Sequence, residues 1–225
     1  MTRLINYLNE NTRQILFDSL EKIEKKCGSY LKEARKRNFG MYSGRKRQGD
    51  KILIEKSVRK DRKPKDTPIE IHNRLDDMFE KKTGIRLRSN SLFCANDKDI
   101  AQGYGRPYYI FPMGKYQTWY NPKVLDLYAY FNNADVKKSL DIHITMTEPL
   151  KLISTKIKED YEYEKLFNNY VENIVDGYKK GFPKKGEIEI TLHCDKYLAV
   201  NYNWAEYAMR IKLGISFDEW LLERK

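Results

Sequence analysis

Residues 88–95 read Arg-Ser-Asn-Ser-Leu-Phe-Cys-Ala, a polar turn that leads directly into a short apolar run. Ser-Asn-Ser is typical of turns, and the apolar residues behind it predict a strand. In an extended chain, alternate side chains point to one side, so the hydroxyls of Ser89 and Ser91 are expected to face the same way. The block therefore predicts a short strand with two hydroxyl groups at its entry.

A helix is predicted on the amino-terminal side of this block, over residues 68–82. Asp66-Thr67-Pro68 offers a capping residue and then proline at the first helical position, and Gly84 is suited to end the helix. The basic stretch 59–65 that precedes the helix is predicted to be extended, because a residue before proline avoids the helical region.

On the carboxyl-terminal side, a short helix is predicted over residues 97–103 and a buried strand over 108–112. Two strands near the end are expected to pair with each other, and helices are expected around them. These later elements are helices at 122–132 and 160–180, strands at 188–192 and 196–200, and a closing helix at 204–223 with a break near Gly214.

The chain begins with a helical pattern over residues 2–37, which the polar residues 9–11 are expected to interrupt. Short strands are predicted at 39–42 and 52–54. Helices at both ends, with strands that do not alternate with helices, predict an α+β fold. At 225 residues, with 40% hydrophobic and 33% charged residues, one domain with appendages is expected.

The composition argues against a metal site and against a membrane protein. Three cysteines and three histidines are scattered without the spacing of metal ligands, so no metal is expected. No apolar run is long enough to cross a bilayer, and the first residues contain no secretory signal. A cytoplasmic location with buried free thiols is therefore expected.

The positive charge is concentrated at the amino-terminal end. Residues 1–65 hold 19 Lys and Arg against 8 Asp and Glu, whereas residues 66–225 hold 24 of each, so the formal charge of +11 lies in the first part. Such asymmetry predicts a polyanionic partner, with nucleic acid or a nucleic-acid-bound protein as the candidates. A solvated basic surface is the alternative.

Together with Ala101, Tyr104-Gly105 and Ile110-Phe111-Pro112, the block 88–95 resembles ADP-ribosyltransferases of the Arg–Ser–Glu type, similar to those of large tailed bacteriophages. The resemblance covers roughly residues 40–120 and 180–200. It implies an ADP-ribosyltransferase-like split β core over residues 39–225, with residues 1–38 as a basic helical extension. It also implies transfer of one ADP-ribose from NAD to a protein or nucleic-acid acceptor, with release of nicotinamide, in the cytoplasm of a phage host.

The resemblance assigns roles to particular residues. Arg62 would hold the phosphates or the nicotinamide ribose, Ser89 and Ser91 would shape the NAD groove, and a late glutamate would be catalytic. The candidates for lining the groove are aromatic, and those for the carboxylate lie at the start of the last strand: Phe93, Tyr104, Tyr108, Glu187 and Glu189. Breaking the nicotinamide–ribose bond develops positive charge on the ribose, which a carboxylate stabilises.

Two assignments stay open. Serine stands where the family places its first-strand arginine, in Tyr42-Ser43-Gly44-Arg45, so either Arg62 or Arg45 takes that role. Glu187 matches the catalytic glutamate, but if Glu189 is catalytic, Glu187 becomes the residue that orients the acceptor.

Each candidate also has a purely structural interpretation. Arg62 lies in a basic run that is typical of a solvated loop, and Glu187 and Glu189 fit a solvent-facing strand. His72 lies within a predicted helix, which favours a partly buried histidine over a role in NAD binding. The alternative functions are a non-catalytic basic nucleic-acid-binding protein and a virion-associated protein on the same scaffold.

Overall fold

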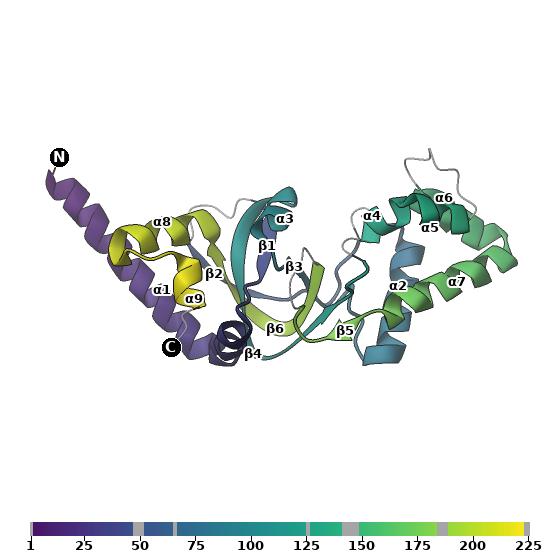
Figure 1. Ribbon diagram of the computed structural model, residues 1–225, viewed down its shortest axis with the longest axis horizontal. Helices are drawn as coiled ribbons and strands as arrows, with labels where there is room; N and C mark the ends of the chain where they lie inside the picture. Colours follow the sequence, from purple (N-terminus) through teal and green to yellow (C-terminus); the bar gives the residue numbers. More distant parts are fainter. Residues whose placement is uncertain are drawn as a thin grey trace.

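The computed structural model describes residues 2–46, 52–64, 67–124, 127–140, 149–183 and 189–222. Helices and antiparallel strands combine in it without regular alternation, which confirms the predicted α+β class. Figure 1 shows an elongated molecule with a sheet in its middle and helices at both ends.

The sheet closes on itself as a small ring of antiparallel strands. Strands β6, β3, β1 and β4 pair in that order, and β4 pairs again with β6 to complete the ring. Strand β2 extends the sheet along the second half of β6, and β5 pairs with the end of β4. The strands are β1 (Tyr42–Arg45), β2 (Leu53–Ser57), β3 (Leu92–Ala95), β4 (Arg106–Tyr120), β5 (Lys179–Lys180) and β6 (Glu189–Asn201).

Strand β6 is continuous, so the prediction of two paired strands at 188–192 and 196–200 is wrong. Both halves of β6 pair with β4, which matches Trp119 to Thr191 and Phe111 to Leu198. The register shift lies between Met113 and Tyr116 of β4, where Gly114 adopts a positive φ of 67°. The long partner strand absorbs the irregularity in a bulge, so β6 needs no turn.

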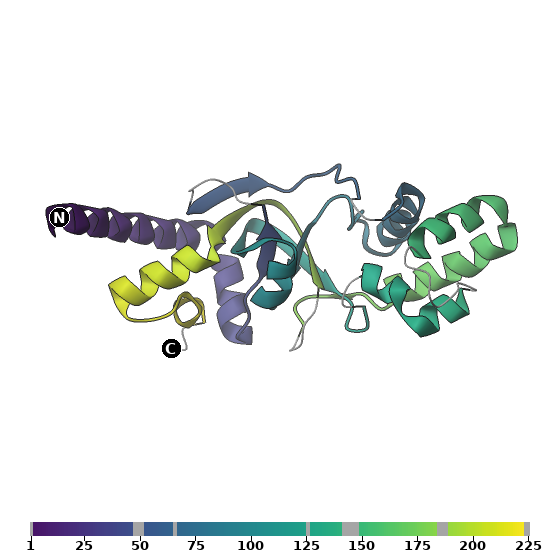
Figure 2. The same ribbon diagram turned by 90° about the horizontal axis from the view of Figure 1, so that it is seen from above.

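Helix α1 (Thr2–Arg37) confirms the predicted amino-terminal helix, but its interruption lies at Cys27 (φ −122°, ψ 21°) and not at residues 9–11. One side of α1 packs on the sheet beside α8 (Tyr202–Leu213) and α9 (Phe217–Leu221) (Figures 1 and 2). The side chains of Leu16, Ile23 and Tyr30 are fully buried there. The helix therefore shares the main hydrophobic core.

A second hydrophobic cluster lies at the other end of the molecule, in a helical lobe (Figure 1). The lobe consists of α2 (Ile69–Thr83), α4 (Leu127–Asn132), α5 (Ala134–Ser139), α6 (Pro149–Glu159) and α7 (Tyr161–Asp176). The sequence predicted α2 and α7, and α4 corresponds to the second half of the helix predicted at 122–132. It did not predict α5 or α6. The buried amide of Asn121 at the end of β4 donates to the carbonyl of Ile174 (2.9 Å), which joins the lobe to the sheet.

Helix α3 (Lys98–Gly103) follows β3 as predicted and lies directly against β1. The Asp97 side chain caps it by accepting a hydrogen bond from Asp99 N (2.6 Å). A Cβ on Gly44 would lie 1.9 Å from the carbonyl oxygen of Ala101, so only glycine permits this approach. The contact places Tyr104, at the end of α3, next to the end of β1.

Candidate functional site

The two faces of β6 differ in chemistry. The even-numbered residues Ile190, Leu192 and Leu198 are buried in the core, on the side covered by α1, α8 and α9. The alternate residues point the other way, together with Phe93, which pairs with Thr191 across β3 and β6. We call this second side the polar face, formed by Phe93, Glu189, Thr191 and His193.

Two arginines converge on one aromatic ring of the polar face. The guanidinium carbon of Arg62 lies 4.2 Å from the centroid of the Phe93 ring, and that of Arg88 lies 4.9 Å from it. Both distances are within the range of cation–π attraction. We call Arg62 and Arg88 the first cation pair.

The backbone on both sides of the ring is held by hydrogen bonds. Arg62 N donates to the carbonyl of Ser89 (3.2 Å), and Arg88 N donates to the Asp76 carboxylate (2.7 Å). The basic segment 59–64 is thus tied to the turn before β3. This explains how residues 26 positions apart in sequence reach the same ring.

The first cation pair is partly removed from water. Burial is the main cause that lowers the pKa of Arg62, and the charge of Arg88 lowers it further, whereas Glu189 acts in the opposite direction. Arg88 Nε is buried and has no hydrogen-bond partner within the described residues. Like charges held together at low solvent exposure favour the binding of an anion.

Ser89 belongs to a buried network that fixes the turn. Its hydroxyl donates to the carboxylate of Asp76 and lies 3.0 Å from His72 Nε2. Asp76 is fully buried and also accepts from Ser89 N (3.3 Å). His72 is buried in α2, and burial is the main cause that lowers its pKa. Ser89 thus anchors the loop through Asp76.

Ser91 is placed differently from Ser89. Its side chain is 2% exposed, and its hydroxyl has no hydrogen-bond partner in the part of the chain that the structure describes. The same holds for the side-chain oxygen of Asn90, while the carbonyl of Asn90 lies 2.9 Å from His193 Nδ1. Buried polar atoms are usually paired, so these two are exceptions within the turn.

The remaining predicted residues are dispersed. Glu189 pairs with Ala95, two residues along β3 from Phe93. It lies within electrostatic reach of Arg62. Tyr108 is 1% exposed and lies between Ser43 and Asn201 in the sheet. Tyr104 is 64% exposed beside Gly44. Glu187 lies outside the described residues.

Arg45 belongs to a second positive group that the sequence did not reveal. Its guanidinium carbon is 4.8 Å from the centroid of the Tyr197 ring, and Lys56 is the direct cross-strand partner of Tyr197. The pKa of Lys56 is lowered by burial and by the charge of Arg45. We call Arg45 and Lys56 the second cation pair. No local sequence signal identifies it, because the approach of Arg45 and Lys56 to Tyr197 depends on how distant strands pair.

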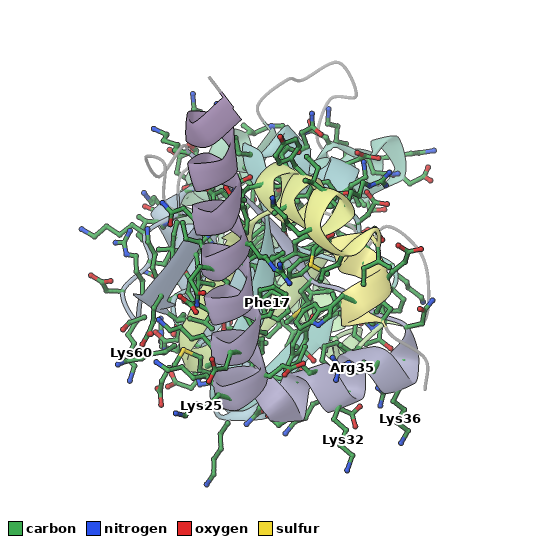
Figure 3. All side chains as sticks on the ribbon, turned by 90° about the vertical axis from the view of Figure 1, so that its left-hand side faces the viewer. Phe17, Lys25, Lys32, Arg35, Lys36 and Lys60 are labelled. Atoms are coloured by element: carbon green, nitrogen blue, oxygen red, sulfur yellow. The ribbon has the colours of Figure 1, made fainter. Side chains whose placement is uncertain are left out.

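The basic residues of α1 are spread out. Figure 3 shows Lys25, Lys32 and Lys36 pointing away from the body of the molecule, with Lys25 before and the other two after the interruption at Cys27. Others are engaged: Lys22 and Lys26 bind Glu55 at 3.1 and 3.0 Å. The close groups of positive charge are therefore the two cation pairs rather than the lysines of α1.

Other site types find no support in the described ranges. They contain no group of three metal-ligating side chains and no helix long and apolar enough to span a bilayer. The three cysteines are free and buried, as predicted. Comparison with protein-family models, with curated proteins and with solved structures finds no match to this chain.

Proposed function

We propose that the protein is a mono-ADP-ribosyltransferase that moves ADP-ribose from NAD to a macromolecular acceptor and releases nicotinamide. The observation that carries this proposal is the convergence of Arg62 and Arg88 on Phe93, with Glu189 within electrostatic reach of Arg62. An ADP-ribosyltransferase-like core over residues 39–225 is part of the same proposal.

The first cation pair suits the pyrophosphate of NAD. Two guanidinium groups on one ring present several N–H donors in a fixed arrangement, which matches adjacent phosphates better than flexible ammonium groups do. The unpaired Arg88 Nε and the buried Ser91 hydroxyl supply further polar atoms for the dinucleotide.

Glu189 takes the role of the catalytic carboxylate in this proposal, and Glu187 that of the acceptor-orienting residue. In the reaction the bond between ribose C1′ and the nicotinamide nitrogen breaks, and nicotinamide leaves with the bonding electron pair. The positive charge on C1′ and the ring oxygen is stabilised by the Glu189 carboxylate. A lone pair of the acceptor then bonds to C1′, and the acceptor releases a proton to solvent.

The second candidate function is nucleic-acid binding without catalysis. The second cation pair favours it, because Arg45 and Lys56 add positive charge to that of Arg62 and Arg88. NAD cleavage distinguishes the two functions.

The test is nicotinamide release from NAD by the full chain, with cell extract as acceptor. Glu189→Gln should lower the rate by at least about a hundredfold, as loss of a charge-stabilising group does. Glu172→Gln, an exposed position on α7, is the matched control and should leave the rate unchanged. Glu187→Gln should retain NAD hydrolysis and lose transfer. Absence of both NAD binding and nicotinamide release in the wild type would overturn the proposal.

A further inference from the structure

His193 lies on the polar face, in the same row of side chains as Glu189. Both are odd-numbered residues of β6 with Thr191 between them, so their side chains leave the same side of the strand. Both are half-buried. The proposed mechanism uses Glu189 but gives His193 no role.

The turn before β3 fixes the tautomer of His193. Its Nδ1 lies 2.9 Å from the carbonyl oxygen of Asn90. A carbonyl oxygen only accepts hydrogen bonds, so Nδ1 carries the proton and donates it. In the neutral imidazole, Nε2 on the far side of the ring then holds a lone pair. Within the described ranges no hydrogen bond to Nε2 is present, so nothing there competes for this lone pair.

We infer that His193 Nε2 is the general base that takes the proton of the acceptor, and that the acceptor group is a hydroxyl. The inference rests on the proposed transfer reaction and adds a residue and an acceptor class to it. A lone pair of the hydroxyl oxygen forms the bond to ribose C1′, while nicotinamide leaves with the electron pair of the broken bond. The hydroxyl proton moves to His193 Nε2, and the resulting imidazolium passes it to solvent.

The spacing along β6 suits a reaction between the two side chains. Four residues of an extended strand separate the Cα atoms of Glu189 and His193 by about 13 Å. The contacts from carboxylate to C1′, from C1′ to the acceptor oxygen and from that oxygen to the base are about 3 Å each, or about 9 Å together. The remainder is within the combined length of the two side chains. A hydroxyl that attacks a ribose held at Glu189 therefore lies within reach of His193.

The charges around the site favour a hydroxyl over other acceptor groups. A carboxylate carries no proton at neutral pH and needs no base. A guanidinium is positively charged, so Arg62 and Arg88, which lie on the Phe93 ring of the same face, repel it. A hydroxyl is neutral and loses a proton as it bonds to C1′, so it is the acceptor that a lone pair at Nε2 serves.

The test separates nicotinamide exchange from net transfer, with the full chain, NAD, and water and methanol as the hydroxyl acceptors. Labelled nicotinamide returns to NAD by attack of its ring nitrogen on C1′. That nitrogen has no proton to lose, so exchange needs no base. His193→Asn should keep exchange and lower the formation of ADP-ribose and methyl ADP-ribose about a hundredfold, as loss of a general base does.

Two substitutions of His193 separate catalysis from structure. The amide of His193→Asn takes the place of Nδ1 and still donates to the Asn90 carbonyl, whereas the amide of His193→Gln corresponds to Nε2 and leaves that carbonyl without its donor. Both variants should lose net transfer, and only His193→Gln should lower the free energy of unfolding. The inference is overturned if His193→Asn transfers as the wild type does, or if exchange falls as much as transfer.

The linkage to the acceptor is tested with cell extract and labelled NAD. ADP-ribose attached through a hydroxyl should withstand neutral hydroxylamine, which cleaves an ester to a carboxylate. Release by hydroxylamine would overturn the assignment of the acceptor group. A wild type that shows neither nicotinamide exchange nor net nicotinamide release would overturn the proposed function itself, and this inference with it.

Discussion

The phenol of Tyr42 donates a hydrogen bond of 2.9 Å to the carboxylate of Asp218, 176 residues further along the chain. This bond joins the first strand to the last helix, in a region where Tyr109 stacks on Tyr202 and donates to Glu206 (2.7 Å). Burial is the main cause that raises the pKa of Asp218, and the neighbouring Glu206 raises it as well, while the hydrogen bonds from the tyrosines lower it.

A carboxyl group with a raised pKa in the fold stabilises the fold when it is protonated, and this contribution is lost as the pH rises through the folded pKa. Asp218→Asn stays neutral and still accepts from Tyr42. Its free energy of unfolding relative to the wild type should therefore increase between about pH 4 and pH 7. Urea unfolding of both proteins at the two pH values measures this difference. A variant that becomes less stable relative to the wild type as the pH rises would contradict the raised pKa of Asp218.

Asp76 is expected to hold the turn that carries Arg88 and Ser89. Asp76→Ala leaves two backbone N–H groups and the Ser89 hydroxyl without their buried acceptor, which should cost about 3 kcal/mol of unfolding free energy. Chemical denaturation measures the loss. Asp77→Ala, the exposed neighbour on the same helix, is the control and should cost less than about 1 kcal/mol. Equal losses in the two variants would show that the turn does not depend on Asp76.

Phe93 is expected to position the first cation pair. Phe93→Leu keeps an apolar side chain but removes the ring beneath Arg62 and Arg88, so NAD affinity should fall about tenfold, while Phe93→Tyr should retain it. Isothermal titration calorimetry with NAD checks this directly. If the leucine variant binds NAD as well as the wild type does, the ring has no part in the site.

Gly44 and Gly28 differ in the space around an added Cβ, so alanine substitutions at the two positions can be compared. A Cβ at Gly44 would collide with the backbone of α3, so Gly44→Ala should cost at least about 1–3 kcal/mol. At Gly28, in α1, nothing lies within 4 Å of the added Cβ, and Gly28→Ala should stabilise the protein by about 0.5–1 kcal/mol. Thermal unfolding compares them, and an unchanged melting temperature for Gly44→Ala would mean that α3 is free to move away from β1.

Removal of residues 1–38 is expected to prevent folding. The deletion uncovers the part of the core that Leu16, Ile23 and Tyr30 fill, and each fully buried large apolar side chain contributes about 1.5–3 kcal/mol. Far-UV circular dichroism and size-exclusion chromatography of the shortened chain test this. A cooperative unfolding transition in the shortened chain would show that the sheet is stable without α1.

Local sequence signals predicted the helix ends that carry a capping residue. Gly84 ends α2 with a positive φ of 74°, and its N–H donates to the carbonyl of Glu80 (2.8 Å). Asp97 and Gly214 likewise cap α3 and α8 as their residue types indicate. Such contacts lie within a few residues of each other, so a single sequence contains them.

The parts that sequence reasoning missed depend on distant partners. Asp195 and Lys196 have polar side chains that are typical of a turn. Pairing of Lys196 with β2 and β4, and the hydrogen bond from Val58 N to the carbonyl of Asp195, keep them in the strand. Arg88 was not a candidate, because its approach to Phe93 depends on the Asp76 network. Glu189 lies within electrostatic reach of Arg62, which no local sequence signal predicts.

Strand β6 also sets the order in which the chain can fold during synthesis. Strand β2 pairs only with β6 among the described strands, and the ring of β1, β3 and β4 closes through it. These earlier strands therefore leave the ribosome long before their partner at residues 189–201 exists. Because pairing between distant segments is slow, the nascent chain exposes unpaired strand edges until its last elements emerge.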